Sequence, residues 1–406
     1  MSKQFHVKAK PFNNLMWATT TFQMGAASLP PIFVPLTESW GRRPGYLVGY
    51  SLYWIWMFPS AFAPNLATLV VTRFFGGGAA ASTINIVGGM IADIWPGGVA
   101  RSRPMSLYVF SQIVDISPGP FIGGSLQTIH VGNPWRWIFW VQRMWGLALM
   151  PVFWFIIRET RGHALLSKRA RKIRQETGRV VYSRFELEMP SALQRLKVST
   201  ARPTRLFLTE PIVLFFTLWV SFAWGILFLF FDSVSLTFRH NYKMDTFTIT
   251  LIELAISVGA VIGIFLNPIQ DWLYAPSAQR DHETSGKPIP GSIIFTAGLF
   301  WYGWASVGDG KLHWIVPTLG IGCTGVGIYS ILLSVLNYIA DSYEKYAASA
   351  LSSTSLGRNI AMDGLGHRLG FIGAGLSIVP VVLIVKGPAI RRRSPFMREP
   401  MFEEDR

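Results

Sequence analysis

The chain has 406 residues, of which 50% are hydrophobic and only 15% charged, whereas a soluble domain usually carries about 25% charged residues. This composition excludes an ordinary soluble domain and predicts a protein that lies in a membrane. The formal net charge of +15 is better explained by cytoplasmic loops facing anionic lipid than by nucleic acid, which we do not expect as a partner. The single cysteine, Cys323, excludes an intrachain disulfide and a thiolate metal site.

Apolar stretches of about 20 residues, the length that crosses a bilayer as a helix, recur along the chain. In the first half they are the moderately apolar segment 16–36, which contains three prolines, and then 45–64, 67–91, 104–128 and 137–157. In the second half they are 207–231, 247–268, 291–307, 314–339 and 369–386. Charged residues interrupt the segment 346–369, which therefore predicts at most a partial span.

These spans predict an all-α polytopic membrane protein with two helical halves and a basic linker. The expected parts are an N-terminal tail (1–15), a helical half (16–158), the linker (159–205), a second half (206–386) and a cytoplasmic tail (387–406). The positive-inside rule places the linker in the cytoplasm. Its stretch 164–175 can form an amphipathic helix with Leu165, Leu166 and Ile173 against lipid or the bundle, and a solvated linker is an equal alternative.

A short run between the first two apolar stretches carries a carboxylate and two adjacent arginines. It reads PLTESWGRRP from Pro35 to Pro44, a pattern typical of a tight cytoplasmic turn between two membrane helices. The run resembles the loop 2–3 signature of the major facilitator superfamily. Further runs that resemble motifs of this superfamily are Arg73 with Gly76 to Gly78, Ala92–Asp93, Ser117 to Gly124, Trp135 to Trp140, Glu159 to Arg161, Asp271 to Tyr274, Asp341 to Tyr343, Ser349 to Leu351, Arg358–Asn359 and Arg393 to Phe396.

In this order the motifs resemble the twelve-helix drug:proton antiporters of fungal type, which include polyamine and multidrug exporters. The family has a full helix before the one ending at Glu38, and its eleventh helix continues beyond Asn359, so the resemblance predicts a missing first helix and a shortened eleventh. About 10 or 11 spans are then expected instead of twelve. Ser39 replaces the usual basic residue of the loop motif, and Val34 replaces its leading glycine. We interpret the chain as a truncated gene model, a splice form or a decayed copy.

The resemblance implies export of small amphipathic drugs, polyamines or secondary metabolites by alternating access. It implies a proton gradient as the energy source, no cofactor or metal, and no enzymatic activity. The expected partners are a small-molecule substrate, protons and the lipid bilayer, with the chain acting as a monomer. We expect the plasma membrane, with the vacuolar membrane as the alternative. Two other functions stay open, namely a facilitative nutrient uniporter and a truncated, non-transporting regulator or inactive copy.

Charged side chains inside apolar spans are costly, so they should face a polar interior and carry a function. We therefore expect transport or proton coupling from Arg73, Asp115 and Glu253, and for the two acids a buried hydrogen-bonding role is the alternative. The residues expected in gating are Glu38, Gly41, Arg42, Arg43, Asp93, Gly119, Pro120, Gly123 and Gly124. Those expected to line a substrate cavity are Gln142, Trp224, Phe228 and Tyr329. Arg143, next to Gln142, either lines the cavity or reaches the membrane interface.

Overall fold

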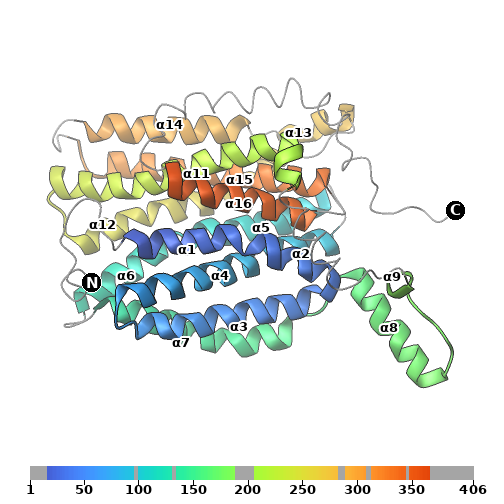
Figure 1. The fold of residues 1–406 in the computed structure, drawn as a ribbon. Coiled ribbons are helices and arrows are strands. Elements are labelled where there is room, and N and C mark those ends of the chain that lie inside the picture. The colour runs from blue at the N-terminus through green and yellow to red at the C-terminus, as the bar shows by residue number, and fades with distance from the viewer. Residues whose placement is uncertain are drawn as a thin grey trace. The chain divides into compact units, whose positions relative to one another are not determined.

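The computed structural model describes residues 16–95, 99–129, 134–187, 205–281, 289–307, 312–343 and 347–365. The regular structure of these residues is α-helical (Figure 1), which confirms the predicted all-α fold. The predicted span 369–386 and both tails lie outside the described residues.

The first four helices follow the predicted spans closely. They are α1 (Met16–Ser28), α2 (Pro30–Trp40), α3 (Arg42–Ala61) and α4 (Leu66–Ile94). The predicted segment 16–36 is helical but divides at Leu29, because Pro30 is the first residue of a new helix, where its missing N–H costs nothing. α4 begins after Asn65, whose side chain accepts a hydrogen bond from the Thr68 N–H at 2.8 Å.

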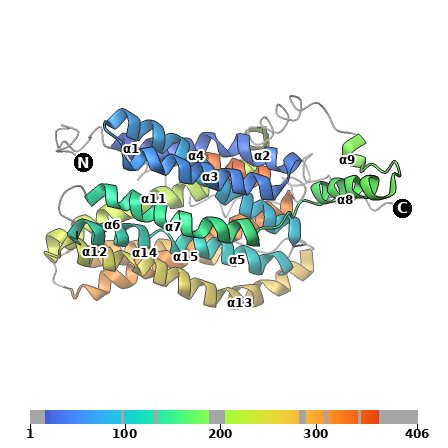
Figure 2. The same ribbon diagram turned by 90° about the horizontal axis from the view of Figure 1, so that it is seen from below.

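The next helices show where the predicted spans are interrupted. They are α5 (Val99–Val114), α6 (Pro118–Ile129), α7 (Pro134–Ile156), α8 (Gly162–Thr177) and α9 (Arg184–Leu187). The span expected at 104–128 is wrong as a single helix, since residues 115–117 form a turn and Pro118 starts α6. The amphipathic helix expected in the linker is confirmed as α8. Both figures show α8 and α9 lying beyond the ends of α2 and α3 (Figures 1 and 2).

The last helices are α11 (Pro211–Asn241), α12 (Thr246–Glu253), α13 (Ala255–Asp281), α14 (Ile289–Ser306), α15 (Ile315–Ser342) and α16 (Ala347–Leu365). The predicted span 247–268 is confirmed as the apolar helical stretch Thr246–Ile269, in which the single residue Leu254 forms a turn between α12 and α13. Within the described residues five helical stretches are long and apolar enough to cross a membrane, judged by length and composition. They are Leu66–Ile94, Trp135–Ile156, Pro211–Asn241, Thr246–Ile269 and Ile315–Ser342.

Helix packing divides the chain into two compact units. Unit 1 comprises Met1–Pro96, Phe139–Leu214 and Tyr346–Ile360, and unit 2 comprises Gly97–Ile138, Phe215–Lys345 and Ala361–Arg406. In unit 1, α4 packs on α1 and α3, and in unit 2, α15 packs on α13 and α14. Each unit draws on both sides of the basic linker, so the division into two halves at residues 159–205 stays a prediction.

Small residues allow the helices of unit 1 to approach closely. A Cβ on Gly77 would collide with the Phe22 carbonyl oxygen, and a Cβ on Gly25 would collide with that of Phe74, so α1 and α4 pack with their backbones in contact. Such packing suits lipid, which provides no hydrophobic drive between helices. α16 contributes its residues up to Ile360 to the same unit, where the Asn359 side chain donates to the Ala26 carbonyl oxygen at 2.8 Å.

The linker helices α8 and α9 are held together by an ion pair. Arg174 Nη1 donates to Glu186 Oε2 at 3.0 Å, and Nη2 donates to Oε1 at 3.2 Å. The Arg174 guanidinium, helped by the backbone N–H of Ser183, holds the pKa of the Glu186 carboxyl below its ordinary value. Leu165 and Leu166 on α8 are exposed, so both the lipid-facing and the solvated interpretation of this helix stay open.

Candidate functional site

The turn between α2 and α3 requires a glycine. Gly41 has φ of +106° and ψ of 153°, a backbone conformation that residues with a side chain rarely adopt. A Cβ at this position would also collide with the Glu159 carboxylate. The glycine of the loop motif is therefore needed for both its backbone and its lack of a side chain.

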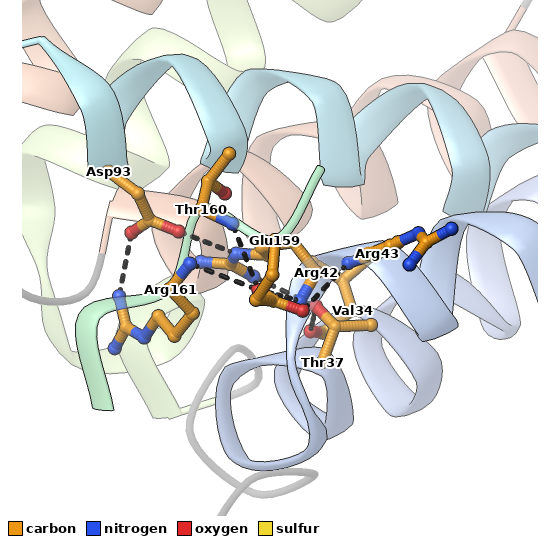
Figure 3. A network of polar contacts seen from close by, with 8 residues as sticks. All are labelled: Val34, Thr37, Arg42, Arg43, Asp93, Glu159, Thr160 and Arg161. Carbon is orange, nitrogen blue, oxygen red and sulfur yellow. Dashed lines mark hydrogen bonds and ion pairs between the residues drawn. The ribbon is translucent and has the colours of Figure 1, made fainter. Parts of the chain in front are cut away.

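The Glu159 carboxylate closes the N-terminus of α3 (Figure 3). Its Oε1 accepts from the Arg42 N–H at 2.8 Å, and its Oε2 accepts from the Arg43 N–H at 3.2 Å. Oε1 also accepts from the N–H groups of Thr160 at 3.1 Å and Arg161 at 3.0 Å. The first N–H groups of a helix have no partner within the helix and favour negative charge. Glu159 thus ties the segment after α7 to the start of α3.

Asp93, near the end of α4, bridges two arginines from distant parts of the sequence. Arg42 Nε donates to its Oδ2 at 2.8 Å, and Arg161 Nη1 donates to its Oδ1 at 2.7 Å. The side chains of Arg42, Asp93 and Arg161 are 1%, 6% and 14% exposed, so these charges are largely removed from solvent. We call Thr37, Arg42, Asp93, Glu159 and Arg161 the Asp93 network.

The network satisfies Arg42 on a second side. Arg42 Nη1 donates to Thr37 Oγ1 at 2.8 Å, and the Thr37 hydroxyl donates to the Val34 carbonyl oxygen at 2.6 Å (Figure 3). A buried charge that keeps all its partners is stable, whereas removing one partner leaves an uncompensated charge. The Asp93 network therefore fixes the ends of α2, α3 and α4 and the segment that follows α7 in one arrangement.

Some members of this network were predicted from the sequence and others were not. Three of the predicted gating residues, Gly41, Arg42 and Asp93, lie together. A fourth, Arg43, lies beside them, and its Nη2 donates to the Trp154 carbonyl oxygen at 3.2 Å. Glu38, also predicted to act in gating, has a side chain that the structure does not describe. Glu159 and Arg161 were recognised only as part of a motif, although an acid between an apolar span and a basic helix was the available signal.

Unit 2 contains a buried ion pair between α5 and α15. Arg101 Nη1 donates to Asp341 Oδ1 at 3.0 Å and to the Ala340 carbonyl oxygen at 2.9 Å, and the two side chains are 2% and 5% exposed. Nearby, the Asn337 side chain donates to Ser102 Oγ at 3.4 Å. Neither member of the Arg101–Asp341 pair was among the predicted site residues. The pair joins the first turn of one helix to the last turn of another that is 240 residues away in sequence.

Arg73 was expected to face a polar interior and to take part in transport or proton coupling. In the described part of the chain its Nε donates to the Ala18 carbonyl oxygen at 3.3 Å. Its guanidinium also lies over the rings of Phe22 at 4.7 Å and Phe139 at 5.4 Å from the ring centroids. These contacts hold α4 against α1, and a transport role for Arg73 stays a prediction.

The two predicted acids lie in different surroundings. Glu253 is buried at the last residue of α12, where its Oε1 accepts from Ser235 Oγ on α11 at 3.1 Å. Asp232, one turn before Ser235 on α11, is exposed and was not predicted. Asp115 lies in the turn between α5 and α6 and is exposed, rather than inside a continuous span as expected. Of these acids, Glu253 has the surroundings of a buried proton-binding group.

The remaining candidates are spread over several helices. In the first turns of α6, Gly119 and Pro120 are exposed and Gly123 and Gly124 are buried. A Cβ on Gly124 would lie 3.1 Å from the Thr250 side chain, so this glycine allows α6 and α12 to pack closely. Of the cavity candidates, Trp224 and Tyr329 are buried and Gln142 and Phe228 are exposed. Among the described residues no group of three or more His, Cys, Asp or Glu side chains is placed to hold a metal ion.

Comparisons with known proteins agree with this helical architecture. Solved structures with the same fold include the proton:xylose symporter XylE, bound to 6-bromo-6-deoxy-D-glucose, at a TM-score of 0.63 and 13% identity, covering 94% of this chain and 86% of that one. The human organic anion transporter MFSD10 matches at a TM-score of 0.55 and 14% identity, covering 91% of this chain and 83% of that one. At these identities the likeness concerns the fold.

Fungal proteins are similar along most of the sequence. The efflux pump atB of Aspergillus terreus is 32% identical over 381 residues, which are 88% of this chain and 78% of the relative. The MFS transporter cpaT of Aspergillus oryzae is 32% identical over 97% of this chain and 82% of the relative. The citrinin biosynthesis cluster MFS transporter mrr1 of Monascus ruber is 30% identical with the same coverages.

The sequence profile of the Major Facilitator Superfamily matches residues 2–362. Members of this superfamily are multi-pass integral membrane transporters of small molecules and are not enzymes. The apolar helices of unit 1 and unit 2 agree with that description. The chain therefore belongs to the major facilitator superfamily.

Proposed function

We propose that this chain is a secondary active exporter of the drug:proton antiporter type, which moves small amphipathic drugs, polyamines or secondary metabolites out of the cytoplasm. The observation that carries the proposal is the buried Asp93 network at the ends of apolar helices, in a chain that is 32% identical to a protein named as an efflux pump. We propose the plasma membrane as its location.

Transport in this proposal proceeds by alternating access. The helices on the two sides of the linker must separate on one face of the membrane and then on the other. The Arg101–Asp341 pair joins α5 from before the linker to α15 from after it, and both helix ends are cytoplasmic in the predicted topology. A pair that forms in one access state and breaks in the other sets the balance between them. We assign the closed cytoplasmic face to the state in which this pair is formed.

Glu253 is the proposed proton carrier. An ionised carboxylate is costly in an apolar span, so a buried acid there binds a proton unless a polar partner or a substrate stabilises its charge. The Ser235 hydroxyl supplies one such partner, and Leu254 forms a turn directly after Glu253. Binding and release of the proton at Glu253 in different access states would couple transport to the gradient.

The test is an efflux assay in yeast cells with low intrinsic drug efflux. Cells expressing the chain are loaded with fluorescent cationic drugs, and efflux is followed with and without a protonophore. Efflux that the protonophore abolishes, and that Glu253→Gln also abolishes, is the expected result. Gradient-independent uptake would favour a facilitative uniporter. Normal membrane insertion without any flux would favour a non-transporting regulator or an inactive copy.

A further inference from the structure

One arginine within a membrane helix of unit 1 has no counter-charge among the residues that the structure describes. Arg143 lies on α7, nine residues after Pro134. Within the described residues its guanidinium makes neither a hydrogen bond nor an ion pair, and its Nη1 atom is buried without a partner. An arginine inside a span is costly and ordinarily pairs with an acid or a carbonyl oxygen. Arg143 therefore has unused capacity to bind an anion.

Three aromatic rings hold the guanidinium in place. It lies 3.9 Å from the ring centroid of Phe58, 5.0 Å from that of Trp54 and 5.3 Å from that of Trp140. The Trp54 indole N–H also donates to the Arg143 carbonyl oxygen at 3.1 Å, which fixes α3 against α7. We call these four residues the Arg143 cage. Cation–π contacts position a guanidinium but leave its N–H donors unused.

One edge of the guanidinium stays accessible. Nη1 is buried, whereas the residue as a whole is only half-buried and its Nε and Nη2 are not among the buried unpaired atoms. Nε and Nη2 form one of the two forks through which arginine binds a carboxylate or phosphate with two parallel hydrogen bonds. One side of the guanidinium is thus buried, and the other side is available to an oxyanion.

The depth of the cage matches a lipid headgroup. Phe58 is three residues before the end of α3, which is about 4 to 5 Å along the helix axis. The Arg143 side chain leans toward the start of α7 and so toward the same end. In the predicted topology this is the outer end of both helices, because α3 begins at the cytoplasmic turn.

The same face of α7 offers a path for an acyl chain. Leu147 and Pro151, four and eight residues after Arg143, continue this face toward the membrane centre. Leu147 is 52% exposed and Pro151 is also exposed. From the open fork, the depth and this apolar path, we propose that the Arg143 cage binds the phosphate of an outer-leaflet phospholipid.

The test measures lipid binding to the purified, delipidated full chain by native mass spectrometry. The probes are dioleoyl phosphatidylglycerol, dioleoylglycerol, which has the same chains without phosphate, and oleate, which carries a carboxylate. The wild type should bind phosphatidylglycerol at one site about tenfold more tightly than dioleoylglycerol, the effect expected of charge-assisted hydrogen bonds. Arg143→Gln should lose this preference, and Arg158→Gln, which removes an exposed charge beyond the other end of α7, should keep it.

Two further variants keep the proposal testable if Arg143→Gln does not fold. Arg143→Lys retains the charge but loses the fork, and should lose most of the preference. Phe58→Leu removes the nearest ring and should weaken phosphatidylglycerol binding about two- to fivefold. Unchanged phosphatidylglycerol binding by Arg143→Gln or Arg143→Lys, or equal binding of dioleoylglycerol by the wild type, would overturn the proposal. Arg143-dependent binding of oleate without binding of phosphatidylglycerol would overturn the assignment to phosphate.

Discussion

Replacing Asp93 with asparagine should destabilise the chain strongly, because Asp93 is the shared partner of Arg42 and Arg161. The substitution keeps the shape of the side chain but removes the charge that compensates two arginines, one of them 1% exposed. Removing one partner of a buried ion pair typically costs about 3 to 5 kcal/mol. The upper part of this range does not apply to the Arg161 contact, since that side chain is 14% exposed and partly solvated.

The assay is thermal unfolding of the purified protein in detergent. With about 2 to 4 °C lost per kcal/mol for a unit of this size, Asp93→Asn should lower the midpoint by about 6 to 20 °C. The matched control is Glu176→Gln, which likewise replaces a carboxylate with an amide. Glu176 pairs with Lys172 on the exposed surface at 3.5 Å, so this change should lower the free energy of unfolding by less than about 0.5 kcal/mol. If both variants unfold within about 2 °C of the wild type, the Asp93 network does not fix these helix ends.

The other predictions concern the turn, the Arg101–Asp341 pair and the linker. Gly41→Ala should cost about 1 to 3 kcal/mol in backbone strain, besides the collision with Glu159, and unfolding at the wild-type midpoint would contradict this. Asp341→Asn should leave the cytoplasmic face open, seen as faster cytoplasmic labelling of an engineered cysteine, and unchanged labelling would exclude the pair as a gate. The ion pair with Arg174 lowers the pKa of the Glu186 carboxyl. The stability that this ion pair gives to α8 and α9 is therefore present above the ordinary pKa of 4.5 and is lost as the pH falls through the lower pKa of the folded state. Hydrogen exchange of α8 and α9, corrected for intrinsic pH dependence, should therefore accelerate as the pH falls below 4.5 in the wild type but not in Glu186→Gln. Equal protection at pH 3 and pH 6 would contradict the role of this pair.

The positions of the helices could be predicted because they depend on local properties. An apolar stretch of about 20 residues predicts a span whatever surrounds it, and the turn at Gly41 follows from a glycine in a short run that carries Glu38, Arg42 and Arg43. The helix break at residues 115–117 and the turn at Leu254 were missed, because hydropathy averaged over a span does not register a local turn. Pro118 was the available signal, since proline commonly starts a helix.

The partners within the site could not be predicted from spacing. Asp93 is separated from Arg42 by 51 residues and from Arg161 by 68, and nothing in the local pattern selects these arginines among the 37 Lys and Arg residues of the chain. The motif resemblance nominated Arg42 and Asp93 separately. Only the packing of α3, α4 and the segment after α7 brings them together. The Arg143 cage has the same origin, because its rings come from two helices that meet in space.

The central claim, proton-coupled export through Glu253, is tested most directly in proteoliposomes that contain only this chain. A transported drug from the efflux panel is added on one side, and the pH on the other side is followed with a trapped dye. We predict that the drug evokes proton movement in the opposite direction with the wild type, and none with Glu253→Gln in protein that is folded and inserted equally well. Drug transport without proton movement, or equal proton movement by the variant, would contradict the claim.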